Sequence, residues 1–278
     1  MVEAKSRVGG VRGREALARR EGAGALASLV LAAIRLAWFV TFTVLCMPVV
    51  LVAAIGDPEG RRAYRVARFW ARICVRSCGV EVSTAGLEHI DPRTSYVFMA
   101  NHRSVFDVLT VVVALGDFQL RWVAKAELAR IPGFGACLRV LKQIFVERGD
   151  HASALASLAA ARERIRGGVS AVFFPEGTRG SGGRMRPFKK GGFVFAIETG
   201  TPIVPVAIVG SGDLRARGSV LRRWRSRLRV VVRTPIATSG LEFADRDALA
   251  ARVRASLAAI VEAPAGAERH GAATGAAR

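Results

Sequence analysis

The chain has 278 residues, of which 51% are hydrophobic and 7% aromatic. This length fits one large domain with appendages or two small ones, and the hydrophobic fraction excludes an intrinsically disordered chain. The formal net charge of +20 implies an acidic partner, and nucleic acid, anionic lipid and a phosphorylated substrate all fit this charge.

The N-terminal part predicts a basic tail followed by a membrane segment. Residues 1–24 are basic, contain glycine and show no sustained apolar period, so we expect a flexible tail. The run from Leu36 to Ile55 carries no charge, and about 20 apolar residues span the core of a bilayer as a helix. It starts too late for an ordinary secretory signal, and a buried core helix rarely stays apolar on every face for this length. We therefore expect membrane insertion.

The segment up to Cys78 predicts a basic amphipathic helix. Aromatic residues at the apolar edge of such a helix are typical of a helix that lies on anionic lipid. The alternative is that the apolar stripe packs on the globular domain; we favour the lipid. Arginines flank the apolar run on both sides, so its orientation stays open, and a re-entrant arrangement with both flanks on the cytoplasmic side satisfies both clusters. The membrane-anchoring and interfacial region thus covers residues 25–78. Its stripe holds Val66, Phe69, Trp70, Ile73 and Cys74, and its basic side Arg61, Arg65, Arg68, Arg72 and Arg76.

Residues 79–262 alternate between short β-type runs and helical ones. Several runs are apolar on both faces, as expected for strands covered by helices on both sides. The pattern predicts an α/β domain with a mostly parallel sheet flanked by helices, behind an N-terminal membrane-embedded helical segment. The small, polar residues 263–278 predict a disordered tail. The expected strands are 80–84, 95–100, 121–125, 144–147, 169–174, 202–209 and 228–234, and the expected helices 104–115, 150–166, 189–199 and 244–262.

A histidine and a carboxylate stand five residues apart between two apolar runs, in the stretch ANHRSVFD. On an ideal helix such a pair is separated by about 140°, so His102 and Asp107 meet only if the histidine precedes the helix and the aspartate lies in its first turn. One interpretation is structural: Ser104 is the N-cap, and Asp107 satisfies backbone donors as in a capping box. The other is catalytic: the carboxylate holds one imidazole nitrogen so that the other acts as a base. The pair alone leaves both open.

The stretch FFPEGTRG follows another apolar run. Pro175 and Gly177 favour a turn there, and Glu176, Thr178 and Arg179 place charge and hydrogen-bonding groups at the carboxyl end of the predicted strand. The alternative is an ordinary polar loop in contact with solvent.

Two basic stretches also suit an anion. In IFVERGD, Arg148 follows an apolar strand, and its planar guanidinium binds oxyanions with two hydrogen bonds. In PFKKGG, Lys189 and Lys190 precede a predicted helix start, which is a plausible anion cradle. Each of these signals is weak by itself.

Other catalytic and ligand motifs do not occur in the sequence. It contains no GxSxG, Walker A, GxGxxG or HExxH pattern, so it gives little support to a covalent serine mechanism or a nucleotide cofactor. Cys46, Cys74, Cys78 and Cys137 form no CxxC pair and no metal-ligand spacing with the histidines. We expect reduced thiols, and neither a metal nor a bound cofactor.

Taken together, four stretches resemble the glycerolipid acyltransferase family, whose best-known members are the 1-acyl-sn-glycerol-3-phosphate acyltransferases. NHRSVFD, IFVERG, FPEGTR and PIVPVAI stand in the order and at the intervals of the four blocks of that family. The resemblance covers roughly residues 80–212, including VAKAELARIPGFG and PFKKGGFVFAIETG between the blocks. HxxxxD alone is a common pattern, but its combination with FPEGTR is highly specific. The second block departs slightly, with Gln143 where the family often has glycine.

The resemblance implies a role for each matching position. His102 corresponds to the catalytic histidine and Asp107 to the aspartate that orients it. Arg148 corresponds to the arginine linked to the substrate phosphate. The other residues implied to bind substrate are Lys125, Glu176, Gly177, Thr178, Arg179 and Lys189.

The implied reaction moves an acyl group from an acyl-CoA or acyl-carrier-protein thioester to the free hydroxyl of 1-acyl-sn-glycerol 3-phosphate, giving phosphatidic acid. Elementary chemistry agrees with it, because a thiol with a pKa of about 8.5 leaves readily and one histidine suffices as the base. Alternative acceptors are a lyso-ornithine lipid, another lysophospholipid and glycerol 3-phosphate.

The implied partners are a lysophospholipid, the acyl donor and an anionic membrane surface, with the catalytic domain on the cytoplasmic side of the cytoplasmic membrane. A basic non-catalytic protein that binds membrane or nucleic acid is the alternative outside the enzymes. We expect no nucleic acid, because aromatic residues are sparse in the basic stretches and no binding motif is recognised.

Overall fold

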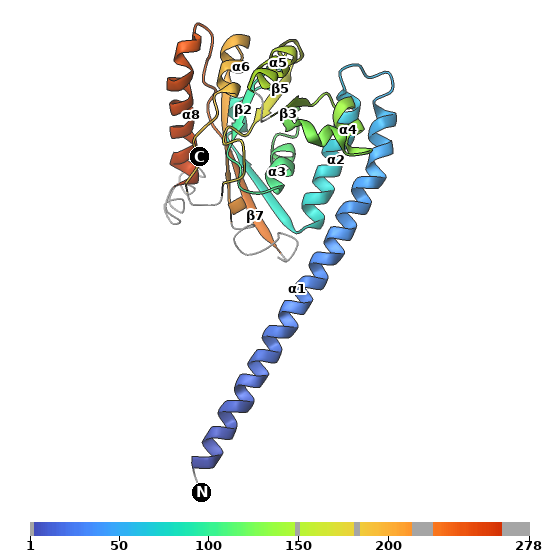
Figure 1. Cartoon of the computed structure of the whole chain (residues 1–278), viewed down its shortest axis with the longest axis vertical. Coiled ribbons are helices and arrows are strands. Elements are labelled where there is room, and N and C mark those ends of the chain that lie inside the picture. The colour runs from blue at the N-terminus through green and yellow to red at the C-terminus, as the bar shows by residue number, and fades with distance from the viewer. Residues whose placement is uncertain (1–2, 148–150, 181–183, 213–224, 263–278) are drawn as a thin grey trace, which may run out of the picture.

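A seven-stranded sheet with the strand order β1-β7-β6-β2-β5-β3-β4 forms the centre of the fold (Figure 1). All neighbouring strands are parallel except β6 and β7. The prediction of a mostly parallel sheet flanked by helices is therefore confirmed. The strands are β1 Val80–Ala85, β2 Val97–Ala100, β3 Gln119–Lys125, β4 Ile144–Val146, β5 Val169–Phe173, β6 Ile203–Val209 and β7 Ser226–Val232.

This computed structural model describes the backbone of residues 3–147, 151–180, 184–212 and 225–262, and the side chains of the same ranges except 3–25 and 151–155. The expected tail at 263–278 lies outside the described residues.

Burial explains the apolar sequences of the central strands. Every residue of β2 and β5 is buried, and so are the first six residues of β6, whereas the edge strand β1 alternates between covered and exposed positions. A strand with helices on both faces has no polar side, so its sequence is apolar throughout. These three strands lie next to one another in the order β6-β2-β5.

Two layers of helices cover the sheet. One face packs on α5, α6 and α8 through residues such as Leu158, Phe193 and Val253, and the other on α2, α3 and α4 through Tyr64 and Val111. Figure 1 shows these two groups on opposite sides of the strands. The helices are α1 Glu3–Ala53, α2 Arg61–Ser77, α3 Phe106–Ala114, α4 Phe134–Val140, α5 His151–Ala161, α6 Gly191–Thr199 and α8 Arg246–Val261.

Helix α1 projects from the domain (Figure 1). Its stretch Leu26–Ala53 has a mean hydropathy of 2.3 and is the one described helix long and apolar enough to cross a membrane. Only 6% of the apolar stretch is buried in the protein, which fits a lipid-facing helix better than a core helix. The backbone is helical from Glu3, and the flexibility expected over residues 1–24 stays a prediction. Alanine, arginine and glutamate favour a helix there, and no proline interrupts it before Pro48.

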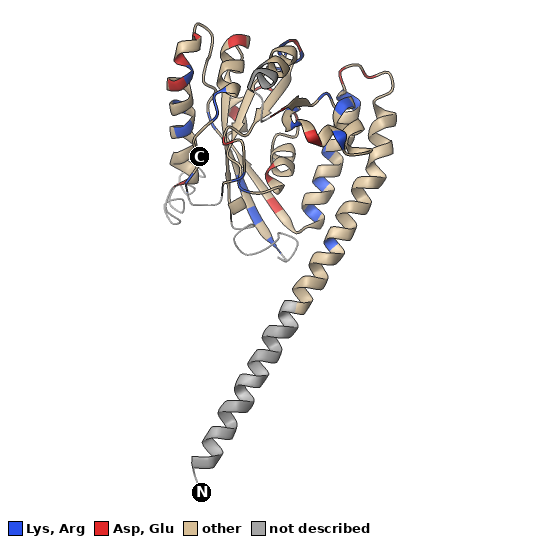
Figure 2. Cartoon of the chain, viewed as in Figure 1, with Lys and Arg blue, Asp and Glu red and all other residues tan. Residues whose placement is uncertain are grey.

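Part of the apolar side of α2 packs on the α/β domain, whereas Phe69 of the predicted stripe is 57% exposed, so the placement of this helix on lipid stays a prediction. Ala71, Cys74 and Val75 are buried against α3 residues such as Phe106 and Leu109. The opposite side of α2 carries exposed arginines, visible as blue bands in Figure 2. An amphipathic helix has the same sequence pattern whether its apolar side meets lipid or protein.

The turn between α1 and α2 is fixed to the domain by polar contacts. Gly60 has a φ of +67°, and a Cβ there would lie 2.8 Å from the carbonyl oxygen of Val140 in α4. From β3, the Arg121 guanidinium donates to the Glu59 carbonyl at 2.5 Å, and Gln119 donates to the Gly60 carbonyl at 3.2 Å. Burial lowers the pKa of Arg121 to about 10. These contacts hold the turn between the two N-terminal helices on the α/β domain.

Candidate active site

The loop after β2 carries the two residues expected to form a dyad. Asn101, at the end of the strand, is fully buried and bonds β6 with both ends of its amide: Nδ2 donates to the Ile208 carbonyl at 2.9 Å, and Oδ1 accepts from the Ile208 N–H at 2.7 Å. The chain after Asn101 therefore leaves the sheet at a fixed point. His102 follows directly, at the carboxyl end of the parallel strands, where sites of α/β proteins usually form.

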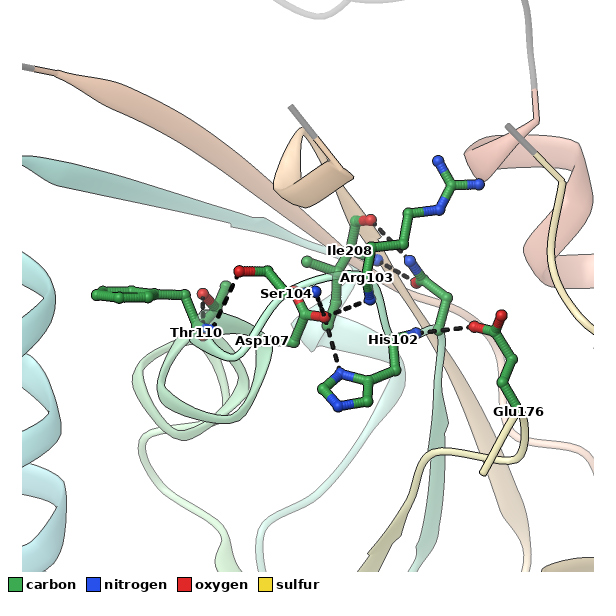
Figure 3. Close-up of polar contacts among 9 residues, drawn as sticks. His102, Arg103, Ser104, Asp107, Thr110, Glu176 and Ile208 are labelled. Carbon is green, nitrogen blue, oxygen red and sulfur yellow. Dashed lines mark hydrogen bonds and ion pairs between the residues drawn. The ribbon is translucent and has the colours of Figure 1, made fainter. Parts of the chain in front are cut away.

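His102 and Asp107 are in contact, as the sequence predicted. Their Nδ1 and Oδ2 atoms lie 2.9 Å apart; the Asp107 side chain is fully buried and that of His102 is 17% exposed (Figure 3). The histidine lies in the loop and the aspartate in the first turn of α3. Because a carboxylate accepts hydrogen bonds, the imidazole tautomer that suits this contact has its proton on Nδ1 and its lone pair on Nε2.

Asp107 also shapes the start of the helix. Oδ2 accepts the backbone N–H groups of Arg103 at 2.6 Å and Ser104 at 2.7 Å, and the Ser104 hydroxyl accepts the Phe106 N–H at 3.2 Å. Half of a capping box is therefore present, although α3 begins at Phe106 with Val105 at the N-cap position. The geometry is compatible with both interpretations of Asp107, because the same oxygen atom contacts the imidazole and the two backbone N–H groups.

The imidazole of His102 is also held on its face. The ring stacks on Phe174, with centroids 3.9 Å apart and planes inclined by 11°, and Phe174 in turn meets Trp122 at 5.5 Å. Beneath this pair, Gln143 accepts the backbone N–H of Trp122 at 2.6 Å. Stacking fixes the ring plane and the bond to Asp107 fixes its rotation, so the direction of Nε2 is determined.

The FPEGTR turn packs against the same loop. Glu176 is buried, with 4% of its surface exposed, and its Oε1 accepts the backbone N–H of His102 at 2.9 Å. Gly177 has a φ of +70°, and a Cβ there would lie 2.7 Å from the Lys189 side chain. The turn requires glycine at this position, because side chains rarely adopt that conformation.

A cavity of about 630 Å³ opens beside His102. Its walls come from α1, α2, α3, β3 and α4 and are mostly apolar, while polar side chains of β3 and of the FPEGTR turn share it with the histidine. Its volume lies in the range of small-molecule sites. The residues that line the cavity include Thr43, Met47, Ala67, Trp70, Val108, Phe134, Leu138, His102, Lys125, Thr178 and Arg179.

The predicted substrate-binding residues divide into two groups. Lys125, Thr178 and Arg179 line the cavity with His102, and Lys125 pairs with Glu127 at 2.6 Å. Glu176, Gly177 and Lys189 are not among its lining residues. Arg148 lies outside the described residues.

Several residues of the site were not found from the sequence. Phe174, Trp122 and Asn101 look like ordinary strand residues there, and Thr43 and Met47 belong to the predicted membrane segment. The sequence did contain one signal for Phe174. Two phenylalanines precede PEGTR, and the second follows the end of β5, where the chain turns toward the site. Contributions from α1 had no sequence signal, because a lipid-facing side and a cavity-facing side are both apolar.

Metal and thiol chemistry find no support in the described part of the chain. No group of three or more histidine, cysteine, aspartate or glutamate residues there is arranged to hold a metal ion. The four cysteines are free thiols, and burial raises the pKa of Cys74 to about 12. A thiol in that state is a packing residue.

A contact between a part-buried histidine and a buried aspartate, at the carboxyl edge of a mostly parallel sheet and beside an apolar cavity, defines an α/β domain with a candidate acid–base site. The family described as Acyltransferase matches residues 81–209. The chain is 31% identical over 228 residues to the 1-acyl-sn-glycerol-3-phosphate acyltransferase alpha of Mus musculus, covering 80% of this chain and 77% of that protein. The chain therefore belongs to the 1-acyl-sn-glycerol-3-phosphate acyltransferase family.

Two further comparisons define the extent of the similarity. The chloroplastic 1-acyl-sn-glycerol-3-phosphate acyltransferase BAT2 of Brassica napus is 33% identical over 172 residues, which are 62% of this chain and 49% of the plant protein. The chain thus spans about half the length of that relative. The crystal structure of the 1-acyl-sn-glycerophosphate acyltransferase PlsC from Thermotoga maritima superposes with a TM-score of 0.67 at 24% identity, covering 86% of this chain and 96% of that one. It shares the fold.

Proposed function

We propose that this protein transfers an acyl group from an acyl-CoA or acyl-carrier-protein thioester to the free hydroxyl of 1-acyl-sn-glycerol 3-phosphate, producing phosphatidic acid. The observation that carries the proposal is the 2.9 Å contact between His102 Nδ1 and Asp107 Oδ2, next to a large apolar cavity. The printed names of the relatives point to the same reaction.

In this mechanism His102 is the general base. Nε2 takes the proton of the acceptor hydroxyl as its oxygen attacks the thioester carbonyl, and Asp107 stabilises the imidazolium that forms. When the tetrahedral intermediate collapses, the carbon–sulfur bond breaks and the proton on Nε2 passes to the thiolate. No covalent enzyme intermediate is required, because the leaving thiolate is already stable near neutral pH.

Three of the N–H groups near the start of α3 are already bound, so the oxyanion of the intermediate needs other donors than these three. The N–H groups of Arg103 and Ser104 already bind Asp107, and that of Phe106 binds the Ser104 hydroxyl. Thr178, Arg179 and Lys125 line the cavity with His102 and carry donor groups. We assign oxyanion and phosphate binding to this polar set, with Arg148 as a further phosphate ligand.

The apolar part of the cavity suits an acyl chain. It is built from side chains of α1, α2, α3 and α4, including Met47, Val108 and Leu138. Burying a chain there removes apolar surface from water at about 25 cal/mol per Å². The exposed apolar stretch of α1 and the arginines of α2 would hold this cavity at an anionic membrane, on its cytoplasmic side.

A product assay tests the proposal. Purified protein is given one labelled acyl thioester and a panel of acceptors: 1-acyl-sn-glycerol 3-phosphate, another lysophospholipid, a lyso-ornithine lipid and glycerol 3-phosphate. We expect phosphatidic acid as the main product, and His102→Ala should abolish it while the protein stays folded and membrane-associated.

A matched control is His89→Ala, which removes a partly exposed histidine in the turn Leu87–His89, outside the cavity lining. It should keep the wild-type rate. Substantial acyl transfer by His102→Ala contradicts the mechanism, and preferential use of another acceptor contradicts the proposed substrate.

A further inference from the structure

We propose that Glu176 is a positioning residue that holds the backbone of His102, and not a ligand of the acyl acceptor as the family resemblance implies. The inference rests on the proposed function for the identity of the reaction, but its evidence is the geometry around one buried carboxylate. Glu176 is 4% exposed and belongs to the turn that follows β5.

Both oxygens of this carboxylate already have backbone partners. Oε1 accepts the N–H of His102 at 2.9 Å, and Oε2 accepts the N–H of Arg186 at 3.0 Å. Glu176 therefore ties together the loop after β2 and the segment that leads into α6, which are far apart in the sequence. Hydrogen bonds to a charged acceptor are shorter and stronger than neutral ones, so this tie is stiff.

A second bond closes the same contact from the other side. Gly180 donates its N–H to the carbonyl oxygen of His102 at 2.9 Å. A Cβ on Gly180 would lie 3.1 Å from Glu176 Oε2 and 3.8 Å from the His102 carbonyl oxygen. Both polar backbone groups of His102 are thus bound to the FPEGTR turn, and the turn is packed closely around them.

The carboxylate does not face the reacting atoms. Figure 3 shows Glu176 approaching the main chain of His102 from the side away from the imidazole ring. Thr178 and Arg179 of the same turn line the cavity, whereas Glu176 does not. An acceptor phosphate also presents only oxygen acceptors and negative charge, so a carboxylate would repel it.

Two buried carboxylates then share the task of holding the catalytic loop. Three successive N–H groups are fixed: that of His102 by Glu176, and those of Arg103 and Ser104 by Asp107. Asp107 alone sets the imidazole rotation, but its 2.9 Å bond to Nδ1 requires the Cα of His102 to be in place. Glu176 supplies that position, so its loss should reduce the rate and leave acceptor binding intact.

The first test separates kcat from KM. Glu176→Gln keeps the shape but replaces one accepting oxygen by a donor, which cannot serve both backbone N–H groups. Because small misplacements of a reacting group are costly, we expect kcat to fall on the order of 10- to 100-fold, with the KM for the acceptor nearly unchanged. Arg186→Ala is the matched control: it removes the exposed side chain but keeps the N–H, and should behave as wild type. A rise in acceptor KM as large as the fall in kcat, or wild-type kinetics in Glu176→Gln, overturns the proposal.

Gly180→Ala provides a second variant that retains the carboxylate. Its methyl group would press on Oε2, so we expect a smaller fall in kcat with the same unchanged KM. Folding of each variant is checked by its thermal midpoint in detergent. The product assay on the wild-type protein tests the proposed function separately. If the wild-type protein uses another acceptor, the kcat and KM of the variants are compared on that acceptor.

A spectroscopic readout needs no substrate. The proton on Nδ1 in a histidine–aspartate pair gives a downfield NMR signal, assigned here by its loss in His102→Ala. Glu176→Gln should broaden or shift this signal, and Arg186→Ala should not. An unchanged signal in folded Glu176→Gln shows that Glu176 does not position His102.

Discussion

At the edge of the sheet, the loop holding His102 is bound through its own backbone to two buried carboxylates, whereas the helices α1, α2 and α4 build the rest of the cavity mainly from apolar side chains. The first region depends on directional contacts of 2.6 to 2.9 Å. The second depends on how much surface it covers, and apolar packing tolerates changes of similar volume. We therefore expect substitutions around the His102 loop to change the rate of acyl transfer. Substitutions along the apolar walls of the cavity should change which acyl chains are used.

The largest effect is expected for Asp107→Asn. An amide can donate to Nδ1, which would place the proton on Nε2 and remove the base, so kcat should fall by about 10²- to 10⁴-fold. The measurement is steady-state acyl transfer. Asp117→Asn is a suitable control, because it makes the same chemical change just after α3, away from the cavity lining. Retention of most activity in Asp107→Asn would mean that the histidine does not depend on this carboxylate.

An intermediate effect is expected for Ala67→Leu in α2. Ala67 lines the cavity and is partly buried, so a larger side chain would occupy space that an acyl chain needs. The preference for palmitoyl-CoA over octanoyl-CoA, measured as a ratio of kcat/KM, should fall by about tenfold or more. Phe69→Leu, on the exposed side of the same helix, should leave the ratio unchanged. An unaltered ratio in Ala67→Leu would show that the acyl chain lies elsewhere.

The smallest effect is expected for Asp57→Ala, in the turn between α1 and α2. Asp57 Oδ2 accepts the N–H groups of Arg62 at 2.6 Å and Ala63 at 3.3 Å. Loss of this cap should lower the free energy of unfolding by about 1 kcal/mol, seen as a lower thermal midpoint in detergent, while kcat changes little. Asp57→Asn retains an accepting oxygen and should lose less.

The same aspartate predicts a pH dependence of stability. Desolvation is the largest single influence and raises the pKa of Asp57, but the backbone N–H groups of Arg62, Ala63 and Arg61, with the charge of Arg62, together lower it below its ordinary 3.8. The folded state thus favours the carboxylate. Its contribution is complete above about pH 4 and is lost as the pH falls further through the folded-state pKa. The difference in thermal midpoint between wild type and Asp57→Ala should shrink below pH 4; a constant difference would contradict the assignment.

The fold could be predicted because the sequences of its central strands are apolar throughout, which indicates that both faces are buried. Continuous apolar runs such as 169–174 and 202–209 can satisfy both faces only inside a covered parallel sheet, and the structure has β5 and β6 there. Helix α4, in contrast, was not expected, since its seven residues follow a proline and a glycine and are too few to show a helical period. The orientation of α2 could not be read either, because its apolar stripe fits lipid and protein equally.

For the site, the sequence by itself determined the local part: His102 before a helix, Asp107 in its first turn, and a second polar turn after a buried strand. These are relations between residues close in the chain, where backbone geometry leaves few arrangements. Only the tertiary structure decided that Glu176 binds the backbone of His102, that Phe174 lies against the imidazole, and that α1 lines the cavity. Those contacts join segments that are far apart in the sequence and are brought together by the packing of the whole sheet and its helices. The residues around a side chain in the sequence do not specify which distant residue it will contact.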